Sequence, residues 1–293
     1  MVEARQERFV NRTGQFSPKP QKQWRLVTRL IRHVGIQQNE REASDVFWTP
    51  ERQQLAQRAI EAINQELEPF GAPSLEFHPD QIKFVPQEEM WAKNARAQCN
   101  PWFGSFKVSY DYLDSDENFL EDTTHEYLHC SSLRLLQKDR EGKLRWRRSG
   151  IQIYCKPLQG GISGDSVLFT DIDEGVIQIT TKQILCRHFL LDRAIDWQGD
   201  LVVGMCEIIS RVNKWCPSSD DVFRIFQTAA FGNGRLLELG RIIENTYGRG
   251  SLRTLGRLFK AIPHTDGYPN MFYSSEFRAL MDFIVEPCAG FRR

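Results

Sequence analysis

The sequence lacks the features that would draw a protein to nucleic acid or into a membrane. Lysine plus arginine and aspartate plus glutamate both number 38, so the formal net charge is zero. No global electrostatic field therefore attracts an anionic polymer or membrane surface, and we predict neither as a partner. No run of about 18 apolar residues occurs, so no transmembrane helix is predicted.

A secretory signal and a cysteine framework are also missing. The N-terminal 23 residues are polar and partly basic, without the apolar segment that a signal peptide needs. The seven cysteines are an odd number, and none of them forms a C-x-x-C pair. We therefore predict reduced thiols in a cytoplasmic protein, rather than a disulfide framework or a cysteine-rich zinc site.

The remaining composition is that of an ordinary globular protein. The 293 residues are 41% hydrophobic and 26% charged, which excludes wholesale disorder, collagen and coiled coil. Residues 1–23 are predicted to be a disordered polar tail, with a nucleic-acid-binding arm as the alternative. A mixed domain is expected at 24–198, and a helical subdomain at 199–293.

Local patterns predict a helix-rich α+β fold. Thr49 and Pro50 suit the N-cap and first position of an amphipathic helix. The segment WFGSFKVSYDYL (102–113) alternates apolar and polar residues, which is typical of a strand. Ser115 is a plausible cap for a helix through about residue 136, and a further helix is expected to start near Thr170.

The first of these two later helices contains His125-Glu126-Tyr127-Leu128-His129, an H-E-x-x-H pattern. Residues four apart lie on one face of a helix, where two imidazoles can reach one Zn²⁺ at about 2.0–2.1 Å. Glu126 lies beside the first ligand and can take a proton from a metal-bound water. The alternative is a surface helix with solvated side chains. The buried side of this helix is predicted to consist of Leu120, Thr124, Leu128 and Leu135.

A third ligand is expected from the helix that starts near Thr170. Glu174 lies in FTDIDEGV (169–176) and supplies the carboxylate that a three-ligand catalytic zinc site needs. Gly175 follows it, although glycine costs about 1 kcal/mol relative to alanine within a helix. We attribute this glycine to a close approach of the two helices that share the metal.

With these residues in place, the chain resembles the gluzincin zinc metallopeptidases, in particular compact, minigluzincin-like members. The resemblance covers residues 100–190 and rests on H-E-x-x-H followed by the E-G-V of the later helix. It implies a zincin-like fold with one Zn²⁺ per chain, held by His125, His129 and Glu174. It also implies a peptide or protein substrate.

The family also implies a substrate-binding edge strand upstream of the first zinc helix, where an extended peptide adds to the sheet. Phe103, Gly104, Ser105 and Phe106 occupy that position in this chain. Thermolysin-like members carry an aspartate four residues after the ligand glutamate, as a partner for a zinc-binding histidine. Gln178 stands there instead, and its amide oxygen can accept the same N–H without charge.

The sequence therefore favours a zinc metallopeptidase in which Glu126 acts as general base on a metal-activated water. Two alternatives stay open: a zincin-fold interaction or regulatory protein with weak or no catalysis, and a non-peptide amidohydrolase. The substrate specificity, the residue that stabilises the oxyanion and the oligomeric state are not determined by any pattern in the sequence.

Overall fold

A computed structural model describes residues 8–9, 47–72, 74–90, 95–100, 105–138, 144–154, 167–232, 236–262 and 272–287. Within these residues the fold is mixed α+β and mostly helical, as the sequence predicts. The predicted tail at 1–23 lies outside the described residues except for β1 (Arg8–Phe9). No helix in the described part of the chain is both long and apolar enough to cross a membrane.

The chain divides into two compact units whose boundaries differ from the predicted ones. The first unit comprises residues 1–144 and 181–193, and the second comprises residues 145–180 and 194–293. Residues 145–180 therefore group with the C-terminal helices, whereas the sequence places a single boundary at 198.

Helix α3 (Pro50–Leu67) opens the first unit as the sequence predicts. The Thr49 hydroxyl accepts a hydrogen bond from the Arg52 amide at 3.3 Å, and Pro50 occupies the first turn. The apolar stripe buries Ala59, Ile63 and Leu67. After the 3₁₀ turn η2 (Glu68–Phe70), Gly71 adopts φ 69°, a left-handed conformation that glycine tolerates without strain.

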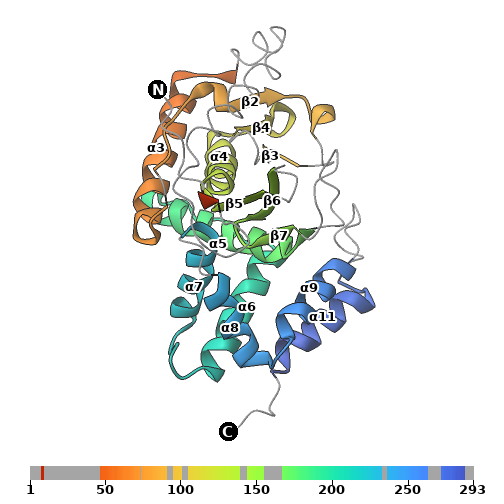
Figure 1. Ribbon diagram of the computed structural model, residues 1–293. Coiled ribbons are helices and arrows are strands. Elements are labelled where there is room, and N and C mark those ends of the chain that lie inside the picture. The colour runs from red at the N-terminus through yellow and green to blue at the C-terminus, as the bar shows by residue number, and fades with distance from the viewer. Residues whose placement is uncertain are drawn as a thin grey trace. The chain divides into compact units, whose positions relative to one another are not determined.

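A three-stranded sheet follows α3, with strand order β2-β4-β3. Strand β2 (Ile82–Val85) pairs in parallel with β4 (Ser105–Ser109), and β3 (Ala97–Asn100) pairs antiparallel with β4. Figure 1 shows the three strands side by side. Short 3₁₀ turns connect these elements: η3 (Pro79–Gln81), η4 (Gln87–Glu89) and η5 (Tyr110–Tyr112).

The central position of β4 corrects one expectation from the sequence. We predicted an edge strand at 102–113, but β4 is hydrogen-bonded on both sides and ends at Ser109. Alternation of apolar and polar side chains reports which face of a strand is buried. It carries no information about whether the strand has one neighbour or two.

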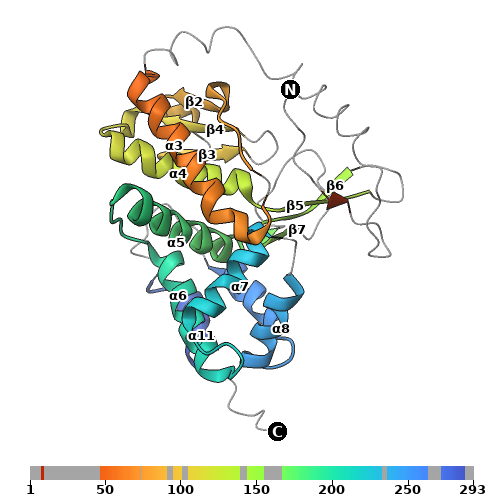
Figure 2. The same ribbon diagram turned by 90° about the vertical axis from the view of Figure 1, so that its left-hand side faces the viewer.

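Helix α4 (Asp116–Ser131) carries the H-E-x-x-H pattern. Its predicted cap is confirmed, because the Ser115 hydroxyl accepts a hydrogen bond from the Asn118 amide at 3.1 Å. The helix ends five residues earlier than the predicted 136, and Leu135 lies in strand β5 (Arg134–Lys138) instead of on its buried side. Strand β5 pairs in parallel with β1. Helices α3 and α4 pack against each other in both views (Figures 1 and 2).

Helix α5 (Thr170–Phe189) begins in the second unit and ends in the first. Its start agrees with the predicted start near Thr170. Toward its C-terminal end, Leu185 is fully buried against Ala59 of α3 and Leu120 of α4. This small apolar cluster attaches the second half of α5 to the first unit.

The second unit combines a small antiparallel sheet with helices. Strand β6 (Leu144–Ser149) pairs with β7 (Gln152–Tyr154), which pairs with β8 (Val167–Leu168). In the described residues beyond 200, the predicted helical character is confirmed. The helices, labelled in Figure 1, are α6 (Trp197–Val212), α7 (Ser219–Phe231), α8 (Leu236–Tyr247), α9 (Ser251–Ala261) and α11 (Ser275–Val285).

Gly175 is required by a close approach, but to a different helix from the one we predicted. A Cβ at this position would lie 2.3 Å from the carbonyl oxygen of Gln198 and 2.8 Å from a methyl carbon of Val202, both on α6. The attribution of Gly175 to a contact between the two metal-binding helices is therefore wrong. The missing side chain lets the second turn of α5 pack against the first two turns of α6.

We expect Gly175→Ala to lower the free energy of unfolding by about 1–3 kcal/mol, because the added methyl group overlaps a backbone carbonyl that cannot move freely. Gly204→Ala is the matched control, since a Cβ there meets nothing within 4 Å. It should stabilise the helix by up to about 1 kcal/mol. Urea denaturation of both variants tests this, and equal effects would contradict the proposed packing.

Candidate metal centre

The two histidines of the H-E-x-x-H pattern face each other on one side of α4. Their Nε2 atoms lie 3.1 Å apart and their ring centroids 4.9 Å apart. Both side chains are half-buried. Two neutral imidazoles at this distance share one hydrogen bond, with the donor set by the tautomer. The predicted same-face placement of His125 and His129 is therefore present.

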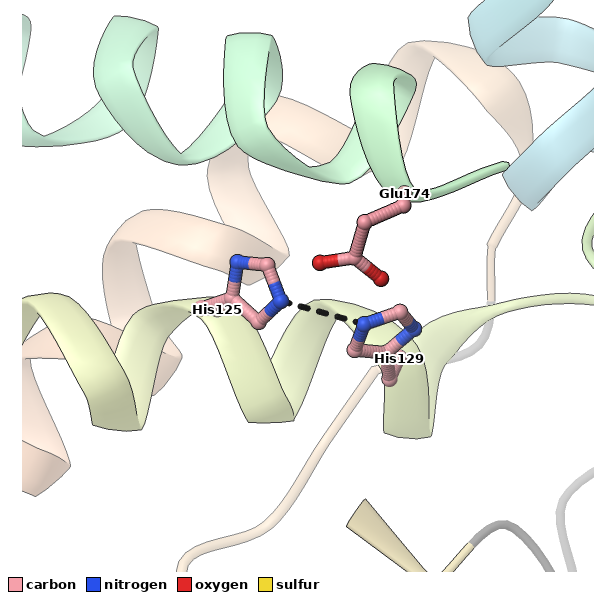
Figure 3. A group of neighbouring side chains, drawn as sticks. All are labelled: His125, His129 and Glu174. Carbon is pink, nitrogen blue, oxygen red and sulfur yellow. Dashed lines mark hydrogen bonds between the residues drawn. The ribbon is translucent and has the colours of Figure 1, made fainter. Parts of the chain in front are cut away.

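Glu174 supplies the third side chain of the group. It stands in the first turns of α5, and Figure 3 shows its carboxylate directed toward the two imidazoles. One ligand atom from each of His125, His129 and Glu174 can be chosen so that all three lie within 4.8 Å of one another. This group could therefore hold a metal ion.

The donor set and its spacing fit zinc. Two nitrogens bound to a tetrahedral ion at about 2.0–2.1 Å lie roughly 3.3–3.4 Å apart, close to the 3.1 Å between the imidazole nitrogens. Two histidines and one glutamate form a three-ligand set that leaves one coordination position open.

Helix α4 is held in place by the buried side chains that lie between the two histidines in the sequence. Tyr127 and Leu128 are 1% and 0% exposed, and the Tyr127 ring meets the Phe106 ring of β4 edge to face at a centroid distance of 4.9 Å. Glu126 is 5% exposed. Burial of this part of α4 leaves His125 and His129 at its half-buried edge, where side chains from another helix can reach them.

An ionic network flanks the same helix one turn earlier. The Arg96 guanidinium donates to Asp122 at 2.6 and 3.0 Å and to Glu121 at 2.9 Å. Burial raises the pKa of Asp122 to about 6, while the positive charge of Arg96 opposes this shift. No motif in the sequence singles out Arg96 or Asp122, because the ion pair joins positions 26 residues apart.

The residue before Glu174 connects α5 to the β6–β7 turn. The buried Asp173 carboxylate accepts a hydrogen bond from the Ile151 amide at 2.7 Å. Arg148, 4% exposed, donates to the backbone carbonyls of Gly150 and Ala229. Burial lowers the pKa of Arg148 to about 10, and the charge of Asp173 opposes this shift. Asp173 thus fixes the start of α5 next to the candidate ligand.

Gln178 makes its described contacts with the start of α6. Its side-chain amide donates to the Gln198 side chain at 3.3 Å and also hydrogen-bonds Asp196. Burial raises the pKa of Asp196, the Gln178 hydrogen bond lowers it, and the charge of Glu174 raises it further. Asp196 is also the N-cap of α6. Its preference for the N-cap position is the signal by which the sequence could have identified this residue. The predicted support of a histidine by Gln178 stays a prediction.

The structure does not place residues 103–106, which the sequence assigns to substrate binding, at an open edge of the described sheet. Phe103 and Gly104 lie outside the described residues. Ser105 and Phe106 belong to β4, where they pair with Asn100 and Cys99 of β3. In the described sheet, β4 is the central strand, and β3 forms the edge on the side where the pairing is antiparallel.

Comparisons with known proteins add no relative: no family model, curated protein or solved structure matches the chain.

We expect Asp173→Ala to lower the free energy of unfolding by about 3–5 kcal/mol, because it leaves Arg148 buried without its nearby negative charge. Asp192→Ala is the control, since its side chain is 79% exposed and forms a surface ion pair with Lys182. That variant should change stability by less than about 0.5 kcal/mol. Thermal or urea unfolding measures both, and a mild effect of Asp173→Ala would refute its structural role.

The metal-binding prediction is tested by titrating zinc into the purified, chelator-treated chain. We expect one equivalent to bind, and the affinity to fall by at least about 100-fold in His129→Ala, because a direct ligand contributes more than an outer partner. His188→Ala should bind like the wild type, since that imidazole contacts Glu66 at 2.9 Å. Equal zinc affinity in His129→Ala and the wild type would eliminate the site.

Proposed function

We propose that the protein is a zinc-dependent metallopeptidase. The observation that carries this proposal is the convergence of His125, His129 and Glu174, with Glu126 placed between the two histidines in the sequence. The resemblance to the gluzincins supplies the same assignment from the sequence. When bound, the zinc ion would polarise the scissile carbonyl and lower the pKa of a water molecule toward about 7.

The remaining chemistry falls to residues of the chain. Glu126 accepts the proton of the attacking water and delivers it to the leaving amine, which is the work of a general base and then a general acid. Its burial on α4, at 5% exposure, restricts its side chain to few conformations. Asp173 and the close packing at Gly175 hold the start of α5, and thereby the direction in which Glu174 projects.

Strand β3 takes over the substrate-binding role that we first gave to residues 103–106. It lies at an edge of the described sheet and contacts α4 through the Cys99 and Cys130 side chains. An extended peptide added to β3 would continue the sheet by backbone hydrogen bonds and would run beside the helix that carries the histidines. The proposed substrate is accordingly an extended segment of peptide or unfolded protein.

Glu126→Gln should abolish hydrolysis while zinc stays bound. The amide cannot accept the water's proton, so we expect kcat to fall by about 10²- to 10⁴-fold, with an unchanged zinc stoichiometry. Glu117→Gln, in the exposed first turn of the same helix, is the matched control and should retain activity. Cleavage of a peptide library, read by mass spectrometry, provides the measurement. Full activity in Glu126→Gln would refute its role as general base.

The same assay distinguishes the peptidase from the other functions that the sequence leaves open. Cleavage that a chelator abolishes and zinc restores supports the peptidase and excludes a protein that acts only by binding. Stoichiometric zinc without turnover of any peptide would favour a non-catalytic zincin-fold protein or an amidohydrolase for non-peptide substrates. A chain that binds no zinc would exclude all metal-dependent versions of the proposal.

A further inference from the structure

Two cysteines of the first unit lie side by side, although 31 positions separate them in the sequence. The Cys99 Sγ on β3 and the Cys130 Sγ in the last turns of α4 are 3.4 Å apart. Neither cysteine is part of a disulfide in the structure. A disulfide needs a sulfur–sulfur distance of about 2.05 Å, so the two atoms would have to approach by a little more than an ångström.

The two thiols differ in their access to solvent. Cys99 is partly exposed on its strand, whereas Cys130 is 1% exposed within α4. A reagent from solution can therefore reach Cys99 first, and the buried thiol is the neighbour that can then attack the modified sulfur. One accessible thiol beside a resolving thiol is an arrangement often found in cysteines that are reversibly oxidised.

We propose that Cys99 and Cys130 form a redox-active pair that closes to an intramolecular disulfide when a low-molecular-weight disulfide, such as glutathione disulfide, oxidises it. This inference goes beyond the proposed peptidase function and does not rest on it, since neither sulfur belongs to the proposed ligand set. Nothing in the spacing of the two cysteines in the sequence indicates the pair.

The reaction balances in two exchange steps. The Cys99 sulfur attacks one sulfur of glutathione disulfide, forms a mixed disulfide and releases one glutathione as its thiolate. The Cys130 sulfur then attacks the Cys99 sulfur and displaces the second glutathione thiolate. The two protons of the cysteine thiols end on the two glutathiones, so one disulfide is reduced and one is formed.

The disulfide would connect β3, the proposed substrate-binding strand, to α4, the helix that carries the two histidines. Cys130 directly follows His129, and Cys99 lies on β3, the edge strand to which we assign the substrate. Closing a loop across 31 positions restricts the unfolded chain, so the oxidised protein should unfold at a higher temperature, by about 5 °C. The disulfide would also remove the freedom of β3 to move relative to the end of α4.

The experiment equilibrates the full-length reduced chain with mixtures of reduced and oxidised glutathione and then blocks the remaining thiols. Peptide mapping without reduction should yield a cross-linked peptide that contains Cys99 and Cys130. Neither of these two cysteines should carry a blocking group, whereas both carry one in the fully reduced control. Cys130→Ser should stop at a glutathione adduct on Cys99. Cys186→Ser, which removes an exposed cysteine of α5, is the control and should form the same bridge.

Zinc-loaded and chelator-treated samples should both form the bridge, so this test is independent of the metal. The proposal is overturned if Cys99 stays reduced at every glutathione ratio, if the wild type accumulates only the adduct, or if a bridge forms between other cysteines. Because the cross-link is mapped in the wild-type chain, the test remains decisive if a serine variant fails to fold. A melting temperature that is identical before and after oxidation would contradict the loop restriction.

Discussion

The burial of α4 is the constraint on which the candidate metal centre depends. Tyr127 and Leu128 are almost fully buried, and they lie between His125 and His129 in the chain. Because a helix turns about 100° per residue, burying these two leaves the flanking histidines at the edge of the same helix. The 3.1 Å between their nitrogens is thus a consequence of helical geometry combined with one packed face.

The position of the third candidate ligand depends on different interactions. The first turns of α5 are held by the Asp173 hydrogen bond to the Ile151 amide and by the close contact of Gly175 with Gln198. Farther along the helix, Leu185 packs in the apolar cluster with α3 and α4. Helix α5 thus carries Glu174 near its start and an apolar anchor toward its end.

Strand β3 forms contacts near the candidate site that the sequence did not predict. Its four residues carry no recognisable pattern, yet they form the edge of the sheet and place Cys99 against the end of α4. The same strand begins just after Arg96, whose guanidinium binds Asp122 and Glu121 on that helix. The proposed peptide-binding strand and the proposed redox pair therefore both lie beside the end of the helix that carries the two histidines.

The sequence by itself determined the local structure around the site. The caps at Thr49 and Ser115, the start of α5 near Thr170 and the shared helix face of His125 and His129 all follow from interactions within a few residues. The tertiary structure decided the central place of β4, the helix that Gly175 approaches, the end of α4 at Ser131 and the pairing of Cys99 with Cys130. These features join positions distant in the chain, and neither periodicity nor capping preference contains information about such contacts.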